Sequence, residues 1–439
     1  MNVHQHQNNI SWGIRNNEEI NKYNEYCNTN LRLIDFPIEF NECADHMCNV
    51  LNHRNVIHKL YNNIIEVLTE ASINSHNKDV HKSGKGKCIQ GWNKHVAESH
   101  RQARIDYQMY VLHGKPETGR IYEKMCLSRK IFKSRLKFCQ THQEQIRMDI
   151  IAAQHSAKQF NKFWLSTKKL GSKVGLPACV DGSSDPKSIA NSFAQHFKVK
   201  SPLQTSENRE IDYCNINQPT LITSKEVGRA IANMKRGKSP GHDGLSVEHL
   251  RYAGTHINRL LAMLYTLCIR HSYLPPELIK TVVVPLVKNH TGDIADKTNY
   301  RPISLATIVA KVLDRVLDER LGQCIDIQDA QFGFRPGLST ESAILTLKHT
   351  VDYYLKRRTP IYACFLDLSK AFDLVSYDRL WNKLGEVGIS PEIIGIFSYW
   401  YSNQKNVIKW ANVYSDEYRL DSGVRQGGLT SPRLFNLYV

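Results

Sequence analysis

The sharpest candidate for chemistry is the block Phe365-Leu366-Asp367-Leu368-Ser369-Lys370-Ala371-Phe372-Asp373. Residues 361–368 form an apolar run of strand length, so Asp367 is expected to follow a buried strand directly and to precede a tight turn. A carboxylate held at a sheet edge suits a divalent cation, because Mg²⁺ prefers carboxylate oxygen and keeps water or substrate phosphates as its other ligands. Taken alone, the block fits an aspartate that only caps a turn better than it fits a metal ligand.

A second candidate is the series Cys43, Cys48, His53 and His58, whose members are evenly spaced by five. Structural zinc usually takes its cysteines two to four residues apart on a tight knuckle. A spacing of five on an expected helix does not converge on one ion, so the sequence disfavours zinc here. The 11 cysteines are an odd number and mostly single. That usage is typical of reduced thiols in an intracellular protein, nuclear or cytoplasmic, rather than of a disulfide framework.

Composition limits the class of protein further. The chain has 439 residues, 41% of them apolar and 23% charged, which is typical of globular domains. It carries 58 Lys and Arg against 42 Asp and Glu, a formal net charge of +16, and this excess favours a polyanionic partner such as nucleic acid. The longest apolar run, residues 260–269, is about half of a membrane span, and the first residues lack a signal sequence. Neither secretion nor membrane insertion is indicated.

The sequence predicts four segments. Residues 1–90 are rich in Asn and His and partly helical, with no legible chemistry. Residues 91–200 are strongly basic and mainly helical, and their cations fit nucleic-acid contact and a plain solvated surface equally well. Residues 201–218 are a polar linker. Residues 220–439 mix helices with short, antiparallel-looking strands, which predicts an α+β fold.

Local signals place several elements of this last segment. Residues 281–284 are β-branched and predict a strand that Pro285 stops. Ser246 and the pair Ser390-Pro391 are expected to begin helices. Residues 407–410 and 418–420 flank a polar turn and predict a hairpin.

The same segment resembles the reverse transcriptases of non-LTR (LINE-type) retrotransposons. The matching blocks, in the order that this family has them, are residues 234–244, 284–288 with 299–305, 331–337, the block around Asp367, and 422–428 with 431–436. Each block alone is only suggestive, whereas all of them in order over one domain are highly specific. The resemblance covers roughly residues 220–439. The basic region before residue 170 resembles, more weakly, the segment between endonuclease and polymerase in some of these elements.

The resemblance implies the fingers and a partial palm of a right-hand polymerase fold, preceded by the basic helical region. The implied activity is RNA-directed DNA polymerisation, a nucleotidyl transfer that uses two Mg²⁺ ions. The implied partners are an RNA template, a DNA primer and deoxynucleoside triphosphates. Two metals suit the reaction because charge develops on both the attacking and the leaving oxygen.

Three residues of the block around Asp367 take roles from this resemblance. Asp367 resembles the first palm aspartate, which ligates both Mg²⁺ ions, and the carbonyl of Leu368 resembles the backbone ligand beside it. Phe372 resembles the aromatic gate beneath the incoming sugar, which excludes a 2′-hydroxyl. Without the surrounding blocks, Phe372 would be read as ordinary core.

Three further residues resemble nucleotide-binding groups. Lys288 and Arg301 resemble the finger cations that hold the triphosphate, and arginine can bind phosphate oxygens bidentately. Gln426 resembles the glutamine over the nucleotide, on a glycine-rich turn that the nucleotide can approach closely. Their alternatives are a solvated strand-end charge for Lys288 and a hydrogen-bonded turn residue for Gln426.

The family also needs a Tyr/Phe-Ala-Asp-Asp block on a hairpin some tens of residues after the glycine-rich turn. The sequence stops at Val439 and contains no Asp-Asp dipeptide, thumb or upstream endonuclease. We therefore expect a fragment truncated within the palm and inactive as it stands, and a real truncation and a gene-model artefact both remain open. The alternative is a non-catalytic nucleic-acid-binding protein derived from such an element. A scaffold without a nucleic-acid role is disfavoured by the charge of +16.

Overall fold

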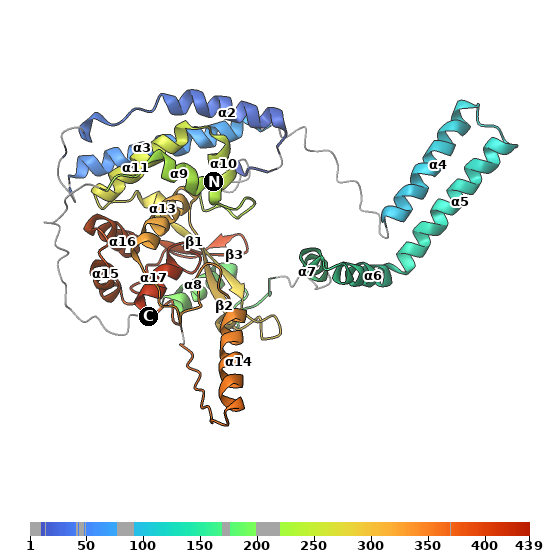
Figure 1. Cartoon of the computed structure of the whole chain (residues 1–439). Helices are drawn as coiled ribbons and strands as arrows, with labels where there is room; N and C mark the ends of the chain where they lie inside the picture. The colour runs from blue at the N-terminus through green and yellow to red at the C-terminus, as the bar shows by residue number, and fades with distance from the viewer. Residues whose placement is uncertain are drawn as a thin grey trace. The chain divides into compact units, whose positions relative to one another are not determined.

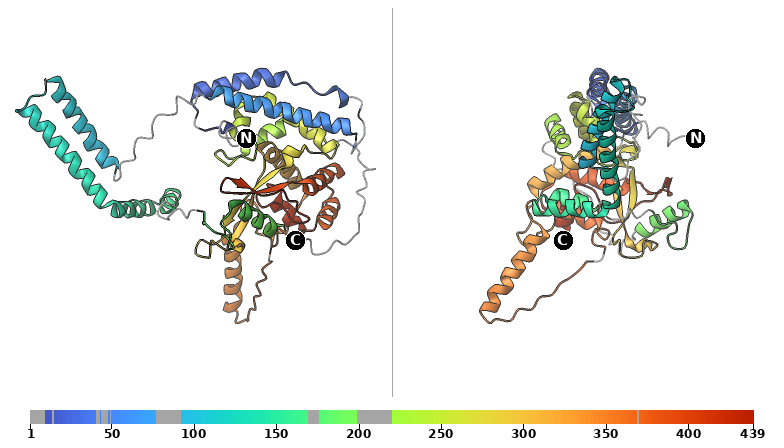
Figure 2. Two further views of the ribbon diagram at one scale, coloured as in Figure 1. Left: turned by 180° about the vertical axis from the view of Figure 1, so that it is seen from behind. Right: turned by 90° about the vertical axis from the view of Figure 1, so that its right-hand side faces the viewer.

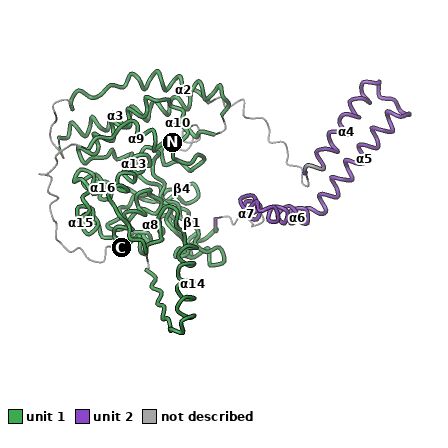
Figure 3. Tube along the Cα trace, viewed as in Figure 1, with its two compact units in different colours: residues 1–77, 177–439 green, residues 78–176 purple. Residues whose placement is uncertain are grey.

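The computed structural model describes residues 10–13, 15–40, 43, 48, 50–76, 92–168, 176–198, 220–368 and 370–439. The chain divides into two compact units (Figure 3). Residues 1–77 and 177–439 form unit 1, and residues 78–176 form unit 2. Unit 2 is therefore inserted in the sequence between two parts of unit 1. This division by compactness does not test the four functional segments, which stay a prediction.

Unit 2 is entirely helical in its described residues. Its helices are α4 (Lys94–Leu112), α5 (Arg120–Thr141), α6 (Gln143–Ser156) and α7 (Phe160–Lys168). Helices α4 and α5 run back along each other as a hairpin (Figure 1). Few side chains are buried between them, Met125 and Cys139 of α5 among them, so the hairpin exposes most of its surface.

Unit 1 begins with α2 (Asn17–Arg32), the short 3₁₀ helix η1 (Ile38–Phe40) and α3 (Leu51–Ser75). Asn16 and Glu19 form a capping box that begins α2, since each side chain accepts a hydrogen bond from the other's backbone N–H at 2.8 Å. Helices α2 and α3 pack on α10 (Val247–Tyr252) and α11 (His256–Arg270). The buried Tyr23 hydroxyl donates to the His249 carbonyl at 3.1 Å. The two parts of unit 1 therefore share one hydrophobic core.

A four-stranded mixed sheet forms the other layer of unit 1. Its strands are β1 (Thr281–Val287), β2 (Tyr300–Leu305), β3 (Asn406–Trp410) and β4 (Val413–Tyr414), in the order β2-β1-β3-β4. Strand β1 is antiparallel to β2 and parallel to β3, and β3 is antiparallel to β4. Helix α8 (Pro186–Phe197) covers one face, where Phe193 meets Tyr300 and Trp410 at ring-centroid distances of 5.0 and 5.1 Å.

Strand β1 continues through Pro285, so the prediction that this proline stops the strand is wrong. Pro285 stands directly opposite Pro302 of β2. Two prolines can oppose each other only as a non-hydrogen-bonded pair, with their nitrogens turned away from each other. On that outer side β1 pairs with β3 only at residues 281–283. The missing N–H of Pro285 therefore breaks no ladder bond.

The remaining elements of unit 1 are α9 (Ser224–Asn233), α12 (Pro276–Ile279), η2 (Lys297–Asn299), α13 (Ile308–Cys324), α14 (Thr340–Lys356), α15 (Tyr377–Glu386), α16 (Pro391–Asn403) and α17 (Ser431–Tyr438). Helices α10 and α16 begin after Ser246 and Ser390, as predicted, and the Ser390 side chain accepts a hydrogen bond from Ile393 N–H. Helix α14 buries none of its residues and stands away from the rest of the unit in both views (Figures 1 and 2).

The strand predicted over residues 361–368 is not formed. The segment is extended without secondary structure, and Tyr362, Phe365 and Leu366 are 93%, 81% and 89% exposed. An apolar run becomes a strand only where a neighbour completes its hydrogen bonds, and no strand within the described residues pairs with this one. The predicted hairpin also differs, because the antiparallel partner strand of β3 is residues 413–414, and β3 meets Tyr418 only in an isolated bridge to Asn406.

Helices and a small mixed sheet thus share one core in unit 1, in agreement with the mixed α+β class predicted. Among the described residues, the structure contains no helix with the length and apolarity that a bilayer crossing requires.

Candidate functional site

The glycine-rich turn at residues 422–428 lies between the segment that carries Phe372 and strand β2. Val424 N–H donates to the Phe372 carbonyl, and Ser304 N–H donates to the Gln426 carbonyl, both at 2.8 Å. Gly423 has a φ of +93°, and a Cβ there would stand 2.8 Å from the backbone of Asp373. Only glycine combines this conformation with so close an approach, so the sequence of the turn dictates where it binds.

The side chain of Gln426 points at the carboxylate of Asp373. Its Nε2 donates to Asp373 Oδ1 at 3.2 Å. Burial raises the pKa of Asp373, while the hydrogen bond from Gln426 and the positive charges of Lys370 and Lys288 oppose that rise. Both side chains line a small pocket together with Val283 of β1, Pro302 and Ser304 of β2, and other residues of the turn.

Cations gather around this pocket. Burial lowers the pKa of His196 in α8, and the positive charges of Lys370, Lys297 and Lys288 lower it further. Lys288 directly follows β1, is exposed, and donates to the Thr298 carbonyl at 2.9 Å. The local field therefore favours an anionic ligand such as a phosphate.

Arg301 and Phe372 occupy different kinds of position. Arg301 is an exposed residue of β2 opposite Leu286 of β1. Phe372 is half-buried between Phe334 and Phe435, at ring-centroid distances of 5.6 and 4.7 Å. The Phe372 ring is therefore held on two sides by aromatic neighbours.

Asp367 lies apart from these groups in the extended segment 361–368. It is exposed, and among the described residues it has no hydrogen-bond or ion-pair partner. Leu368, beside it, is 62% exposed. The structure thus joins the Gln426 turn to the backbone of Phe372, and the charge of Lys288 acts on Asp373, the partner of Gln426. Asp367 and Arg301 have no hydrogen bond or ion pair to any of these residues within the described part of the chain.

Sequence reasoning missed the anchor that holds the turn. The carboxylate of Asp314 in α13 accepts hydrogen bonds from Arg425 Nη2 at 3.0 Å, Leu429 N–H at 2.7 Å and the Thr430 hydroxyl at 2.6 Å. The Arg425 guanidinium also lies over the Trp400 ring, 4.1 Å from its centroid, and is almost fully buried. One signal in the sequence could have identified Asp314. It lies on the apolar face of its helix, next to Leu313 and three residues before Leu317, and an acid buried there needs a partner.

A second pocket lies on the other side of the same turn. It is lined by an apolar floor that includes Ile303 and Leu245 and by four cations, Lys235, Lys238, Lys311 and Arg315. The Gly237 N–H in the loop at its edge donates to Glu248 at 2.7 Å, which fixes the loop that carries two of these cations. Apolar surface rimmed by positive charge suits the bases and phosphates of a nucleic acid.

The comparisons with known proteins agree with this geometry. Residues 287–439 match the family model described as "Reverse transcriptase (RNA-dependent DNA polymerase)". The chain is 25% identical over 264 residues to a protein named "Probable RNA-directed DNA polymerase from transposon BS" of Drosophila melanogaster, a match that covers 57% of this chain and 29% of that one.

Two further relatives are of the same kind. The "RNA-directed DNA polymerase from mobile element jockey" of Drosophila funebris is 23% identical over 261 residues, which is 57% of this chain and 28% of that one. The "Retrovirus-related Pol polyprotein from type-1 retrotransposable element R2" of Popillia japonica is 28% identical over 216 residues, 49% of this chain and 29% of that one. The matches therefore span less than a third of the length of these relatives.

Residues 287–439 of this chain therefore carry a reverse transcriptase domain. More particularly, it is a domain of the type found in the polyproteins of non-LTR retrotransposons.

Proposed function

We propose that residues 220–439 are the fingers and part of the palm of an RNA-directed DNA polymerase, and that they bind an RNA template, a DNA primer and a deoxynucleoside triphosphate. The observation that carries this proposal is the junction of three family segments at one pocket. There the Gln426 turn is bound to Phe372 and to Ser304 of β2 through backbone hydrogen bonds. The cations around the pocket suit a triphosphate.

In this proposal Lys288 and Arg301 bind the triphosphate, and Gln426 lies over the nucleotide. Phe372 supports the sugar, and the rings of Phe334 and Phe435 pack on either side of it. Asp373 orients Gln426 through the 3.2 Å hydrogen bond and is a positioning residue. Asp367 and the carbonyl of Leu368 would supply ligands for Mg²⁺ where the remaining carboxylates of the family are present.

Divalent metal ions serve nucleotidyl transfer in this family by stabilising charge on the reacting oxygens. The donor set of this chain does not fit two such ions. Asp367 is exposed, and the one cluster of three or more metal-ligand side chains within the described residues lies elsewhere. The 439 residues also contain no Asp-Asp dipeptide. We therefore propose that the 439-residue chain alone binds primer and template without extending the primer.

The first test is a primer-extension assay on an RNA template with Mg²⁺ or Mn²⁺. We expect no incorporation by the 439-residue chain, and incorporation that depends on both template and Asp367 would overturn the proposal of inactivity.

The second test is a chimera that continues the chain with the Asp-Asp hairpin and thumb of a relative. In an active chimera, Asp367→Ala should abolish synthesis by removing a metal ligand. Phe372→Ala should keep synthesis and admit ribonucleotides more readily, because only the clash with the 2′-hydroxyl is relieved. Synthesis that is indifferent to Asp367→Ala, or sugar discrimination that is unchanged in Phe372→Ala, would contradict these residue roles.

A second candidate function is nucleic-acid binding without catalysis. It is favoured by α5, which carries one acid, Glu123, and exposes the seven cations Arg120, Lys124, Arg129, Lys130, Lys133, Arg135 and Lys137. Exposed aromatic side chains accompany them in unit 2, Phe138 and Trp164 among them. Cations and exposed rings together are typical of surfaces that bind single strands. The intracellular location predicted from the cysteines remains a proposal.

A further inference from the structure

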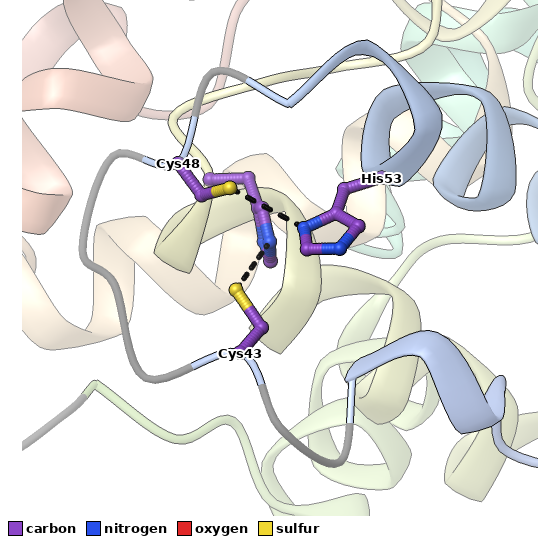
Figure 4. A group of neighbouring side chains, drawn as sticks. Cys43, Cys48 and His53 are labelled. Carbon is purple, nitrogen blue, oxygen red and sulfur yellow. Dashed lines mark hydrogen bonds between the residues drawn. The ribbon is translucent and has the colours of Figure 1, made fainter.

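Four metal-binding side chains from distant parts of the sequence meet in the helical half of unit 1. Cys43 and Cys48 lie in the stretch between η1 and α3, and His53 lies in the first turn of α3 (Figure 4). The fourth side chain is His271, which ends α11 more than two hundred residues further along. Figure 4 shows the labelled sulfur and nitrogen atoms turned toward a common centre.

The distances fit one tetrahedral ion. Cys43 Sγ is 3.6 Å from His271 Nε2, and Cys48 Sγ is 3.3 Å from His53 Nδ1. All four ligand atoms lie within 4.8 Å of one another. Zinc bonds of about 2.3 Å to sulfur and about 2.0–2.1 Å to nitrogen put neighbouring ligands about 3.4–3.8 Å apart in a tetrahedron. The 3.6 Å edge has that length, the 3.3 Å edge is about 0.1 Å shorter, and no edge exceeds the range by more than about 1 Å.

The surroundings prepare the imidazole of His271 to bind metal. Its Nδ1 is 2.9 Å from the Leu267 carbonyl, which can only accept, so Nδ1 carries the proton and Nε2 faces Cys43 with a free electron pair. Histidines that bind metal usually donate their other ring N–H in this way, to a backbone carbonyl or a carboxylate. The Phe40 ring packs on both imidazoles, 5.2 Å from His53 and 5.1 Å from His271.

The site is mostly buried, with Cys43 and His53 partly exposed at its edge. Cys48 is 6% exposed and His271 is 1% exposed. Two thiolates and two imidazoles form the donor set that selects zinc over harder cations such as Mg²⁺. Four protein ligands leave no open position, which is typical of structural rather than catalytic zinc.

We propose that Cys43, Cys48, His53 and His271 bind one zinc ion, which joins the N-terminal helices to α11 of the polymerase domain. The site differs from the one that the even spacing suggests. His58 is not a member, since its Nε2 lies 2.9 Å from Glu277. The sequence disfavours zinc because a helix is expected to carry the evenly spaced cysteines and histidines. In the structure both cysteines precede α3, and the fourth ligand comes from α11.

The test is the zinc content of the purified full chain after dialysis, measured by inductively coupled plasma mass spectrometry. We expect about one zinc per chain, the stoichiometry of a four-ligand structural site. Cys43→Ala and His53→Ala should lose most of this zinc. His58→Ala and Cys126→Ala are matched controls, because they remove a nearby imidazole and an exposed thiol outside the cluster, and both should keep it.

Cobalt provides a readout on the wild-type chain, whose spectrum does not depend on whether the variants fold. Wild-type chain loaded with Co²⁺ should show the visible absorption of four-coordinate cobalt and a thiolate charge-transfer band, which Cys43→Ala should lose. A folded wild-type chain that takes up neither metal overturns the proposal. So does a Cys43–Cys48 disulfide in the protein purified under reducing conditions, or zinc loss in the control variants equal to that in Cys43→Ala.

Discussion

The carboxylate of Asp243 is held in the core beside the second pocket. Its Oδ1 accepts a hydrogen bond from Leu245 N–H at 3.3 Å, while Oδ2 is buried and has no partner within the described residues. Burial raises the pKa of Asp243 to about 7 from its ordinary value of 3.8, and the nearby Lys311 offsets this only in part. The folded protein therefore holds a proton there that the unfolded chain releases.

This shift predicts that stability falls as the pH rises. Between pH 3.8 and about 7 the folded state binds more protons at Asp243 than the unfolded state does, so the free energy of unfolding decreases across that window and levels off above it. At about 1.4 kcal/mol for each pKa unit, the loss is at most about 4 kcal/mol. Asp243→Asn should remove this part of the pH dependence, because the amide cannot ionise.

The measurement is the free energy of unfolding from urea titrations at about pH 5 and about pH 8, an interval that contains most of the pH range over which Asp243 loses its proton. The matched control is Asp326→Asn, which neutralises an exposed aspartate. The drop in unfolding free energy should shrink in Asp243→Asn and persist in the control. An equal drop in both variants would show that Asp243 is ionised in the folded state.

The resemblance to reverse transcriptases, more than residue types and spacing, indicates the candidate site. It points to Gln426, whose glycine-rich turn matches a family block, and gives no role to Asp373, to which Gln426 donates a hydrogen bond. His271 could not be predicted as a neighbour of Cys43, because their meeting depends on how α11 packs against the N-terminal helices.

At the scale of elements, helix α13 fixes the position of the glycine-rich turn and of α17. Asp314 binds the buried Arg425, and one turn later Asp318 binds Arg433 of α17 at 2.8 Å. The two ion pairs differ in burial, since the side chains of the first are 3% and 4% exposed and those of the second 23% and 14%. The same helix thus offers a buried anchor and a partly exposed one.

We predict that Asp314→Ala lowers the free energy of unfolding by roughly 3–5 kcal/mol, because it leaves the guanidinium of Arg425 buried without a partner. Asp318→Ala, the matched control on the same helix, should cost less than about 1 kcal/mol because Arg433 stays solvated. Chemical denaturation followed by circular dichroism measures both. Similar losses in the two variants would refute the difference between the anchors.

Elements that begin with a local signal were predictable. Ser390 and Pro391 begin α16 through a side-chain cap and a preset backbone angle, which need no distant partner. The state of residues 361–368 could not be predicted in this way, because an apolar run forms a strand only beside another strand. The prediction that Pro285 ends the strand was wrong for the same reason, because the effect of a proline depends on which side of β1 is paired at that position.

For the whole molecule, the excess of positive charge should govern the binding of nucleic acid. We predict binding of RNA or DNA with little sequence preference and a steep dependence on salt, because phosphate neutralisation releases counterions. With about six phosphates contacted, log K against log salt should have a slope near −5 on duplex and near −4 on single strands. Fluorescence anisotropy titrations over a salt series measure the slope, and a flat affinity would contradict the prediction.

Helix α5 supplies the variants for this experiment. Lys130→Glu with Lys137→Glu reverses two exposed charges on α5, and Lys59→Glu with Lys225→Glu makes the same change of net charge in unit 1. If both α5 lysines contact phosphates, the first pair should make the slope on duplex less steep by about two. The control pair should leave it nearly unchanged, and equal effects would show that only the net charge matters.

The packing of α2 and α3 on α11 has a consequence for synthesis on the ribosome. Helix α3 ends at Ser75 and α11 begins at His256, so 180 residues are translated between them. At about 5–20 residues per second, the N-terminal helices wait roughly 9–36 s for the surface that covers them. During that time the apolar side chains of Leu60, Ile64 and Leu68, buried in the finished protein, lack their partners. We therefore expect a ribosome-associated chaperone to bind the α2–α3 hairpin for as long as α11 is missing.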